Sequence, residues 1–254
     1  AEAHDVSRRD FVKTAGAVTV ATTALAGAQA KAAAYIRKVN AANNQVQFGV
    51  IGTGGRGQYL LNHFNTLDIG RCVAVCDIYE PNLKKGMAAS KDKPQGYKDY
   101  RELLSRKDID AVVIATPLYV HFPVTKDALE AGKHVFCEKS LVHKPEEVHL
   151  LRALKNSKPN LVLQTGLQRR YSLFYQTAKQ MIDQGLLGDV THVRAQWHRN
   201  SNQRRPVPDP KLDRKINWRM YKEYAGGNTA ELASHQMDVA DWMFGAHPEF
   251  VVGV

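Results

Sequence analysis

Lys139, Glu231 and His235 are residue types that could together take a proton from a secondary alcohol and stabilise the charge that forms. A histidine, with an ordinary pKa near ~6.5, can accept a hydroxyl proton at neutral pH. A lysine ammonium stabilises a developing alkoxide. Glu231 precedes His235 by four residues, so on one helix its carboxylate would lie beside the imidazole and orient it. Taken alone, these residues are better explained by a surface salt bridge at Glu138 and Lys139 and by a helix cap or core pair at Glu231 and His235. Their occurrence together with a dinucleotide-binding pattern reverses that preference.

A glycine-rich turn near residue 50 predicts the partner that such chemistry needs. The apolar run Val46 to Ile51 leads into a GxGxxG pattern made of Gly52, Thr53, Gly54, Gly55, Arg56 and Gly57. In a dinucleotide site the first glycine allows a tight turn, the second lets the backbone approach a pyrophosphate, and the third lets the next helix pack closely. The N–H groups at the start of that helix, at Gly55 and Arg56, would face the phosphates. A glycine-rich surface turn is the alternative interpretation.

Asp77 distinguishes between the two nicotinamide dinucleotides. It ends the next apolar run, Cys72 to Cys76, and follows Gly57 by twenty residues. A carboxylate at this place hydrogen-bonds the ribose 2′-hydroxyl of NAD and repels the 2′-phosphate of NADP. The next residues, Ile78 and Tyr79, offer no arginine for a phosphate. NAD is therefore the predicted cofactor, and NADP is disfavoured.

Further candidate residues for the cofactor site follow later apolar runs. Thr116 and Pro117 come directly after the run Ala111 to Ala115, at a strand end of the kind where open α/β sheets bind their ligands. His121 could reach the same cleft, and a histidine that merely starts a helix is an equally good interpretation. Glu138 follows the next apolar run. We expect all four residues to border the dinucleotide.

Apolar runs of strand length alternate with helical patterns between residues 46 and 165, which is the rhythm of βαβ units. The predicted fold class is α/β, with a Rossmann domain over 46–165 built on a doubly wound parallel sheet. The rhythm changes near Thr165. Residues 166–254 are predicted to form part of a second, α+β domain, with helices over 172–184 and 229–244 and strands over 190–198 and 250–254.

These segments together resemble the Gfo/Idh/MocA oxidoreductase family, whose motifs occur in order over residues 46–254. Besides the glycine-rich turn, the resemblance is carried by Asp110 to Pro117, His121, Ala128 to Lys139, Gln168 to Tyr171, Gly226, Gly227, Glu231, His235 and Asp238. It implies a Rossmann domain joined to a domain with a largely antiparallel open sheet. It also implies a sugar or cyclitol substrate that lies on the nicotinamide.

The resemblance assigns expected roles to the same residues. Lys139 matches the lysine that hydrogen-bonds the reacting hydroxyl, and His235 matches the general base. Glu231 stands where many members of the family have aspartate. The three residues that open the second domain are expected to contact the substrate: Arg169, Arg170 and Tyr171.

The chain departs from the family pattern in two ways. Many relatives have proline after the Glu-Lys pair, and this chain has Ser140. Because a cis peptide bond without proline costs about 2.5 to 4 kcal/mol, the bond before Ser140 is expected to be trans. The resemblance also implies a second domain longer than residues 166–254, so we expect a fragment of a longer protein, and a homo-oligomer when full length.

The first thirty residues have the features of a twin-arginine export signal. Arg8 and Arg9 precede a weakly apolar run, Ala15 to Ala28, and a small-x-small pattern at residues 28–30. We expect a signal peptide over 1–30, a linker over 31–45, contact with the twin-arginine machinery, and a periplasmic or otherwise exported bacterial protein. The run is shorter than the ~20 residues of a membrane span, so no stable span is expected. A basic amphipathic N-terminus is the alternative.

The chain is basic, with a net charge of +10, which permits an anionic partner. Residues 199–222 hold eight Lys or Arg and two Asp, without a recognisable nucleic-acid-binding motif. A solvated loop, or a loop that meets an anionic substrate or partner, is favoured over nucleic-acid binding. Cys72, Cys76 and Cys137 stand in apolar runs, which predicts buried thiols, no disulfide and no metal site.

Three functions remain open from the residues. The first is an NAD-dependent oxidoreductase that acts on a secondary hydroxyl of a sugar, sugar derivative or cyclitol. The second is an NAD-dependent glycosidase that oxidises the sugar transiently to permit elimination. The third, suggested only by the basic stretch, is a nucleic-acid or anionic-surface binding protein.

Overall fold

A computed structural model describes residues 45–252 except 199, 201 and 202. The predicted signal peptide, and all of the predicted linker but its last residue, lie outside the described residues. Within the described part, no helix is both long enough and apolar enough to cross a membrane.

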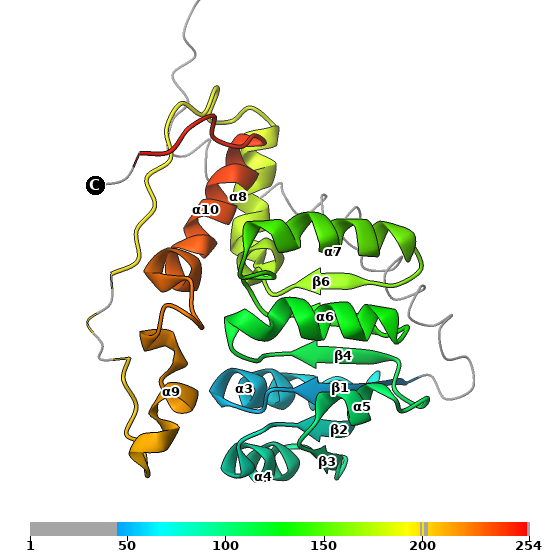
Figure 1. The fold of residues 1–254 in the computed structure, drawn as a ribbon. Coiled ribbons are helices and arrows are strands. Elements are labelled where there is room, and N and C mark those ends of the chain that lie inside the picture. The colour runs from blue at the N-terminus through cyan, green and yellow to red at the C-terminus, as the bar shows by residue number, and fades with distance from the viewer. Residues whose placement is uncertain (1–44, 199, 201–202, 253–254) are drawn as a thin grey trace, which may run out of the picture. The chain divides into compact units, whose positions relative to one another are not determined.

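The amino-terminal half is a six-stranded parallel sheet in the order β3-β2-β1-β4-β5-β6 (Figure 1). Its strands are β1 (Val46–Ile51), β2 (Gly70–Cys76), β3 (Gln95–Tyr97), β4 (Ala111–Ile114), β5 (His134–Cys137) and β6 (Leu163–Thr165). The order reverses between β1 and β4, and ligands of doubly wound sheets bind at the carboxyl ends of the strands at such a point. The predicted α/β fold is confirmed.

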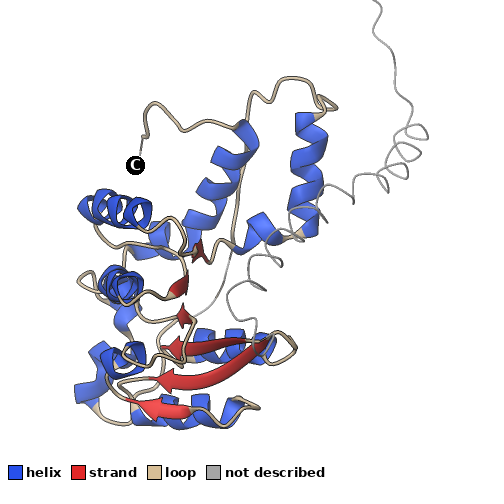
Figure 2. Cartoon of the chain, turned by 90° about the vertical axis from the view of Figure 1, so that its right-hand side faces the viewer, coloured by secondary structure: helices blue, strands red, loops and turns tan. Residues whose placement is uncertain are grey.

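Helices cover both faces of the sheet (Figure 2). The helices are α3 (Gly55–Phe64), α4 (Glu80–Ala89), α5 (Tyr100–Leu104), α6 (His121–Glu130) and α7 (Pro145–Ser157). Leu60 and Leu61 of α3 and Leu83 of α4 pack on one face, around Val50 and Val75. The other face packs against α5, α6 and α7, with buried side chains of all three helices in one cluster. Successive strand residues alternate between these two cores, as the pleat of a strand requires.

The three cysteines lie inside this sheet, buried and free of disulfides, as predicted. Burial raises the pKa of the Cys72 thiol to about 11 and that of the Cys76 thiol to about 12. They serve as small core residues.

Beyond β6 the described chain is helical or irregular. It forms a 3-10 turn (Gln168–Tyr171), α8 (Leu173–Asp183), α9 (Asp213–Ile216), a π-helical turn (Thr229–Ala233) and α10 (Ser234–Phe244). In Figure 1 the segment with α9 and α10 passes the sheet edge toward which the strand arrows point. This segment is therefore placed to complete a site at that edge.

Two strands predicted for the second half are absent from the described residues. Residues 190–198 and 250–252 have no strand structure, so the prediction of strands there is wrong for the described positions, and residues 253–254 lie outside them. A strand is defined by hydrogen bonds to a neighbouring strand, and these segments find none among the residues with described positions. The predicted helices over 172–184 and 229–244 are confirmed, the second with a π-helical first turn.

Candidate functional site

The glycine-rich turn joins β1 to α3 in the geometry that its sequence predicts. Gly52 has a φ of +89°, and a Cβ atom there would lie 2.8 Å from the backbone of Ala115, at the end of β4. A Cβ atom on Gly57 would lie 1.9 Å from the carbonyl oxygen of Gly52. Both positions therefore require glycine. By contrast, a Cβ atom on Gly54 would come no nearer to another residue than 3.7 Å, from Asn82 Nδ2.

The turn has unsatisfied polar groups that fit a phosphate-bearing dinucleotide. Gly54 is the N-cap of α3, and no side chain of a described residue caps the helix there. Free N–H groups at such a terminus bind phosphate oxygens. The Oγ1 atom of Thr116, at the carboxyl end of β4, is buried and has no hydrogen-bond partner within the described chain. Such an orphaned hydroxyl is expected to bond a ligand.

Asp77, at the carboxyl end of β2, is held firmly beside this turn. Its Oδ2 atom accepts a 2.9 Å hydrogen bond from the backbone N–H of Thr53, and its Oδ1 atom accepts a 2.8 Å bond from that of Tyr79. Burial raises the pKa of the Asp77 carboxyl, and these bonds oppose the shift. The Oδ2 atom also accepts a 3.5 Å hydrogen bond from the Thr53 hydroxyl. A carboxylate at this strand end is suited to a ribose hydroxyl.

Arg56 and Glu138 bridge the turn and the end of β5. The Arg56 guanidinium lies 2.7 Å from Glu138 Oε1, and the Glu138 side chain is 10% exposed. A Cβ atom on Gly166 would lie 3.0 Å from the same carboxylate, so Glu138 is enclosed on that side too. The pair borders the candidate cofactor site, where the two side chains satisfy each other.

His121 links two strand ends at the floor of the site. Its imidazole is 2% exposed, with Nε2 lying 2.9 Å from the carbonyl oxygen of Thr116 and Nδ1 lying 2.7 Å from that of Ser140. Burial lowers the pKa of His121. His121 thus lies between the segments that follow β4 and β5, and as a neutral imidazole it donates to one of the two carbonyl oxygens. Pro117 precedes the 3-10 turn Leu118–Val120 that leads to this histidine.

The peptide bond between Lys139 and Ser140 is cis, so the prediction of a trans bond is wrong. Two tertiary contacts of Ser140 accompany the cis bond, and the local preference for trans does not take such contacts into account. Its carbonyl oxygen bonds His121, and its Oγ atom lies 3.3 Å from the carbonyl oxygen of Ala230.

Lys139 reaches from the end of β5 to the π-helical turn Thr229–Ala233. Its Nζ atom donates to the carbonyl oxygens of Glu231 at 2.5 Å and Ala230 at 3.2 Å. Burial lowers the pKa of Lys139. A carbonyl oxygen has two lone pairs, so it can accept from the ammonium as well as from another donor.

His235 follows the π-helical turn at the start of α10 and is 8% exposed. Its ring stacks on Trp197, with the ring centroids 5.7 Å apart. Burial, assisted by the positive charges of Lys139 and Arg169, lowers the pKa of His235 to about 4. The imidazole is therefore neutral at pH 7, which is the form that accepts a proton.

Glu231 does not have the position that its spacing predicts. Its Oε2 atom accepts a 3.1 Å hydrogen bond from Arg219, and the side chain is 12% exposed. Because Glu231 stands in a π-helical turn, the regular α-helical spacing that would align it with His235 does not hold. Its backbone carbonyl, rather than its carboxylate, contacts Lys139.

The three residues predicted to contact substrate have different surroundings. Arg169 lies over the Trp197 ring at 4.8 Å, and its Nη1 atom is buried without a hydrogen-bond partner among the residues with described positions. Arg170 pairs with Asp238 of α10 at 2.7 Å. Tyr171 is 66% exposed and bonds Gln164. Arg169 shares Trp197 with His235, so of the three it is the one brought toward the catalytic candidates.

Trp197 is a site residue that the sequence did not reveal. It lies in an irregular segment and contacts both His235 and Arg169. Its indole provides an apolar wall beside the imidazole of His235. Nothing in its sequence neighbourhood distinguishes it from a core tryptophan.

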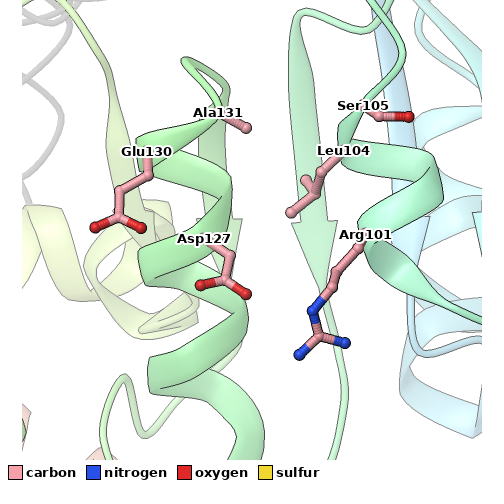
Figure 3. A pocket seen from close by; sticks show the side chains of 6 residues that line it. All are labelled: Arg101, Leu104, Ser105, Asp127, Glu130 and Ala131. Atoms are coloured by element: carbon pink, nitrogen blue, oxygen red, sulfur yellow. The ribbon is translucent and has the colours of Figure 1, made fainter.

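A pocket elsewhere in the molecule lies between α5 and α6. Figure 3 shows Arg101, Leu104 and Ser105 opposite Asp127, Glu130 and Ala131. The residues that α6 contributes lie toward the end of that helix remote from His121. Asp127 accepts a hydrogen bond from the hydroxyl of Tyr100. The pocket is separate from the glycine-rich turn. Among residues with described positions, no cluster of His, Cys, Asp or Glu suited to a metal ion is present.

The chain is similar to curated proteins of two activities. It is 32% identical over 198 residues to an uncharacterised oxidoreductase of Synechocystis, covering 77% of this chain and 50% of that protein. It is 30% identical over 214 residues to the α-N-acetylgalactosaminidase of Shewanella oneidensis, covering 76% of this chain and 46% of the relative. The chain thus spans about half the length of the curated relatives it matches.

Solved structures agree with the fold. The apo crystal structure of scyllo-inositol dehydrogenase from Lactobacillus casei matches with a TM-score of 0.64 and 25% identity, over 80% of this chain and 55% of that one. Another structure of that enzyme contains NAD(H) and scyllo-inositol.

Two family descriptions match successive parts of the chain. Residues 46–166 match the oxidoreductase family with an NAD-binding Rossmann fold, and residues 175–254 match the GFO/IDH/MocA C-terminal domain. Together with the sheet order and the glycine-rich turn, these matches show that the chain belongs to the Gfo/Idh/MocA oxidoreductase family.

Proposed function

We propose that this protein is an NAD-dependent oxidoreductase that transfers hydride between a retained nicotinamide cofactor and a secondary hydroxyl of a sugar, sugar derivative or cyclitol. One observation carries the proposal. A buried histidine that is neutral at pH 7, His235, and the ammonium of Lys139 meet at the sheet edge that also holds the glycine-rich turn.

Each residue of the proposed site has a separate role in the oxidation of an alcohol. When bound, the nicotinamide supplies the hydride acceptor. His235 takes the hydroxyl proton, because its imidazole is neutral over the whole range above about pH 4. Lys139 donates a hydrogen bond to the reacting oxygen and stabilises its negative charge. The contacts of Lys139 with the carbonyl oxygens of Ala230 and Glu231 orient it.

Arg169 and Trp197 are the proposed substrate-binding residues. The unsatisfied Nη1 atom of Arg169 provides a donor for a substrate oxygen, and the Trp197 ring beside it provides an apolar surface for a ring carbon face. Arg170 and Tyr171 are not expected to touch the substrate, because Arg170 pairs with Asp238 and Tyr171 faces solvent.

A glycosidase that oxidises its sugar transiently is the second candidate function. The relative from Shewanella oneidensis is named as an α-N-acetylgalactosaminidase. Both functions need the same first step, loss of the hydroxyl proton and of a hydride from the carbon that bears it, so the same residues serve both. An aryl α-N-acetylgalactosaminide separates them: net cleavage without lasting reduced cofactor supports the glycosidase.

Export through the twin-arginine route accords with cofactor retention. The segment around Arg8 and Arg9 is our reason for proposing a periplasmic location. A compartment without a free nucleotide pool would require the cofactor to be bound before export and recycled by a second substrate. Mass analysis of the nucleotide released by denaturing the exported, full-length protein tests this proposal, and an exported protein without nucleotide would contradict it.

The test of the activity uses the full-length protein and a panel of cyclitols and sugars. We expect one class of compound to reduce the bound cofactor, detected by its fluorescence. Lys139→Ala and His235→Ala are each expected to lower turnover by at least about 100-fold while the dissociation constant of NAD changes little. No bound nucleotide and no binding of added NAD would overturn both enzyme functions.

A further inference from the structure

The basic stretch of the sequence places one arginine at the glycine-rich turn. The nearest atom to a Cβ built on Gly55, among residues outside the turn, is Nη2 of Arg205 at 3.8 Å. Gly55 is the first residue of α3, where N–H groups are free to bind an anion. The guanidinium of Arg205, from the second half of the chain, thus lies near the amino-terminal end of α3, which belongs to the first half.

The backbone of Arg205 is fixed by a buried amide. Asn217, which is 3% exposed, accepts the Arg205 N–H at 2.7 Å and donates to the Arg205 carbonyl oxygen at 2.9 Å. The same Nδ2 atom donates to Asp213 at 2.8 Å. Pro206 follows directly and restricts Arg205 to extended backbone angles. Asn217 and the following proline therefore fix the backbone position of Arg205.

The guanidinium of Arg205 differs from those of its neighbours in having no carboxylate partner. Arg204 pairs with Asp213, Arg214 with Glu223, and Arg219 with Glu231. The Arg205 side chain makes neither a hydrogen bond nor an ion pair with any residue of known position. The residue is exposed, and an unpaired guanidinium beside free N–H groups is suited to an anion with two oxygens in one plane.

We infer that Arg205 clamps the pyrophosphate of the dinucleotide against the amino-terminal end of α3. The inference rests on the proposed function, because it concerns the cofactor of that reaction. The pyrophosphate would be bound between backbone N–H groups of the glycine-rich turn and a guanidinium from the other half of the chain. Release of the dinucleotide then requires Arg205 to move away, which favours a retained cofactor.

The test compares ligands with and without a pyrophosphate on Arg205→Met, Arg205→Lys and wild-type protein, all full length and stripped of nucleotide. The matched control is Lys211→Met, which removes an exposed charge from the same stretch. Isothermal titration gives the dissociation constants of ADP-ribose and adenosine. Because a hydrogen bond to a charged group contributes about 1.5 to 3 kcal/mol, Arg205→Met is expected to weaken ADP-ribose binding at least about tenfold and to leave adenosine binding unchanged.

The dissociation constants of the variants decide whether Arg205 binds the pyrophosphate. Arg205→Lys is expected to lie between wild type and Arg205→Met, and Lys211→Met is expected to match wild type. Wild-type affinity of Arg205→Met for ADP-ribose, or an equal loss for adenosine, overturns the clamp while leaving the proposed function intact. A wild-type protein that binds neither ADP-ribose nor NAD overturns both.

Discussion

The surroundings of His235 decide which proton chemistry it can perform. The imidazole is buried against Trp197, and the cations of Lys139 and Arg169 disfavour its protonation, so its pKa falls to about 4. Asp238 opposes this shift but does not cancel it. A histidine of this kind is unprotonated, and so able to accept a proton, at every pH near neutrality, and its low pKa makes it a weaker base than an ordinary imidazole.

A proton titration of His235 checks this account. We expect its imidazole signals, assigned by comparison with His235→Gln, to titrate with a pKa of about 4, below the ordinary ~6.5. Lys139→Met removes a neighbouring positive charge, so the pKa of His235 is expected to rise in that variant. A wild-type pKa at or above the ordinary value would contradict the described environment.

Asp77 is the residue that we propose to select NAD over NADP. Its carboxylate is fixed by the N–H groups of Thr53 and Tyr79, and a carboxylate at this strand end would repel a 2′-phosphate. Asp77→Ala is expected to reduce the preference for NAD over NADP by about tenfold or more, since one charge repulsion and one hydrogen bond are removed. Glu130→Ala, which removes an exposed carboxylate, is the control. Unchanged discrimination in Asp77→Ala would show that another group sets the preference.

The sequence predicted the parts of the candidate site whose backbone is fixed by a motif. It predicted less well which side chains pair with one another through tertiary contacts. The glycine-rich turn, Asp77 and Thr116 lie together at strand ends, because the order of a parallel sheet brings successive carboxyl ends to one edge. Glu231 pairs with Arg219 instead of His235, a choice made by residues distant in sequence. Arg205 was hidden within a run of similar charges.

At the scale of elements, the connection from β1 to α3 requires Gly52 and Gly57 for its backbone shape, whereas Gly54 leaves space for a ligand. A side chain on Gly57 would overlap the Gly52 carbonyl oxygen, 1.9 Å away, whereas one on Gly54 meets its nearest contact at 3.7 Å. The backbone of Gly54 is extended, with φ −67°, so alanine is sterically permitted there.

This difference predicts opposite effects for two single-methyl substitutions. Gly57→Ala is expected to lower the free energy of unfolding by about 3 kcal/mol or more, because backbone must move. Gly54→Ala is expected to change it by less than about 1 kcal/mol and to weaken NAD binding instead. Urea unfolding and titration with NAD measure the two effects, and equal stability losses would contradict the packing described for the turn.

Elements of the sheet were predictable from apolar runs because buried parallel strands are apolar along their whole length. β3 has three residues and α5 has five, too few for a recognisable period. Residues 190–198 carry a strand-like alternation but are irregular in the described chain, because pairing with another strand decides whether such a segment forms a sheet.

For the whole molecule, buried neutral histidines make folding sensitive to mild acid. Burial lowers the pKa values of His121 and His134, and it lowers that of His235 to about 4. When the folded pKa lies below the unfolded value, the unfolded chain binds the proton more tightly, so stability falls as the pH drops from the unfolded pKa toward the folded one.

The free energy of unfolding should therefore fall between pH 7 and pH 5. For His235 alone the decrease is expected to be about 2 kcal/mol, and the other two histidines add to it. Urea unfolding at several pH values measures the slope, with His235→Gln as the control that reduces it. A stability that is constant across this range would contradict the burial of these imidazoles.

The central claim is that the two halves of the chain form one site for hydride transfer to a bound dinucleotide. The most direct measurement uses the full-length protein and a cyclitol or sugar that reduces its cofactor, with deuterium on the carbon that is oxidised. After denaturation, the mass of the released nicotinamide nucleotide reports where the label went. We predict that the nucleotide carries the deuterium and that Lys139→Ala and His235→Ala, though able to bind NAD, give almost none. Deuterium found in solvent water, with unlabelled nucleotide, would contradict the account.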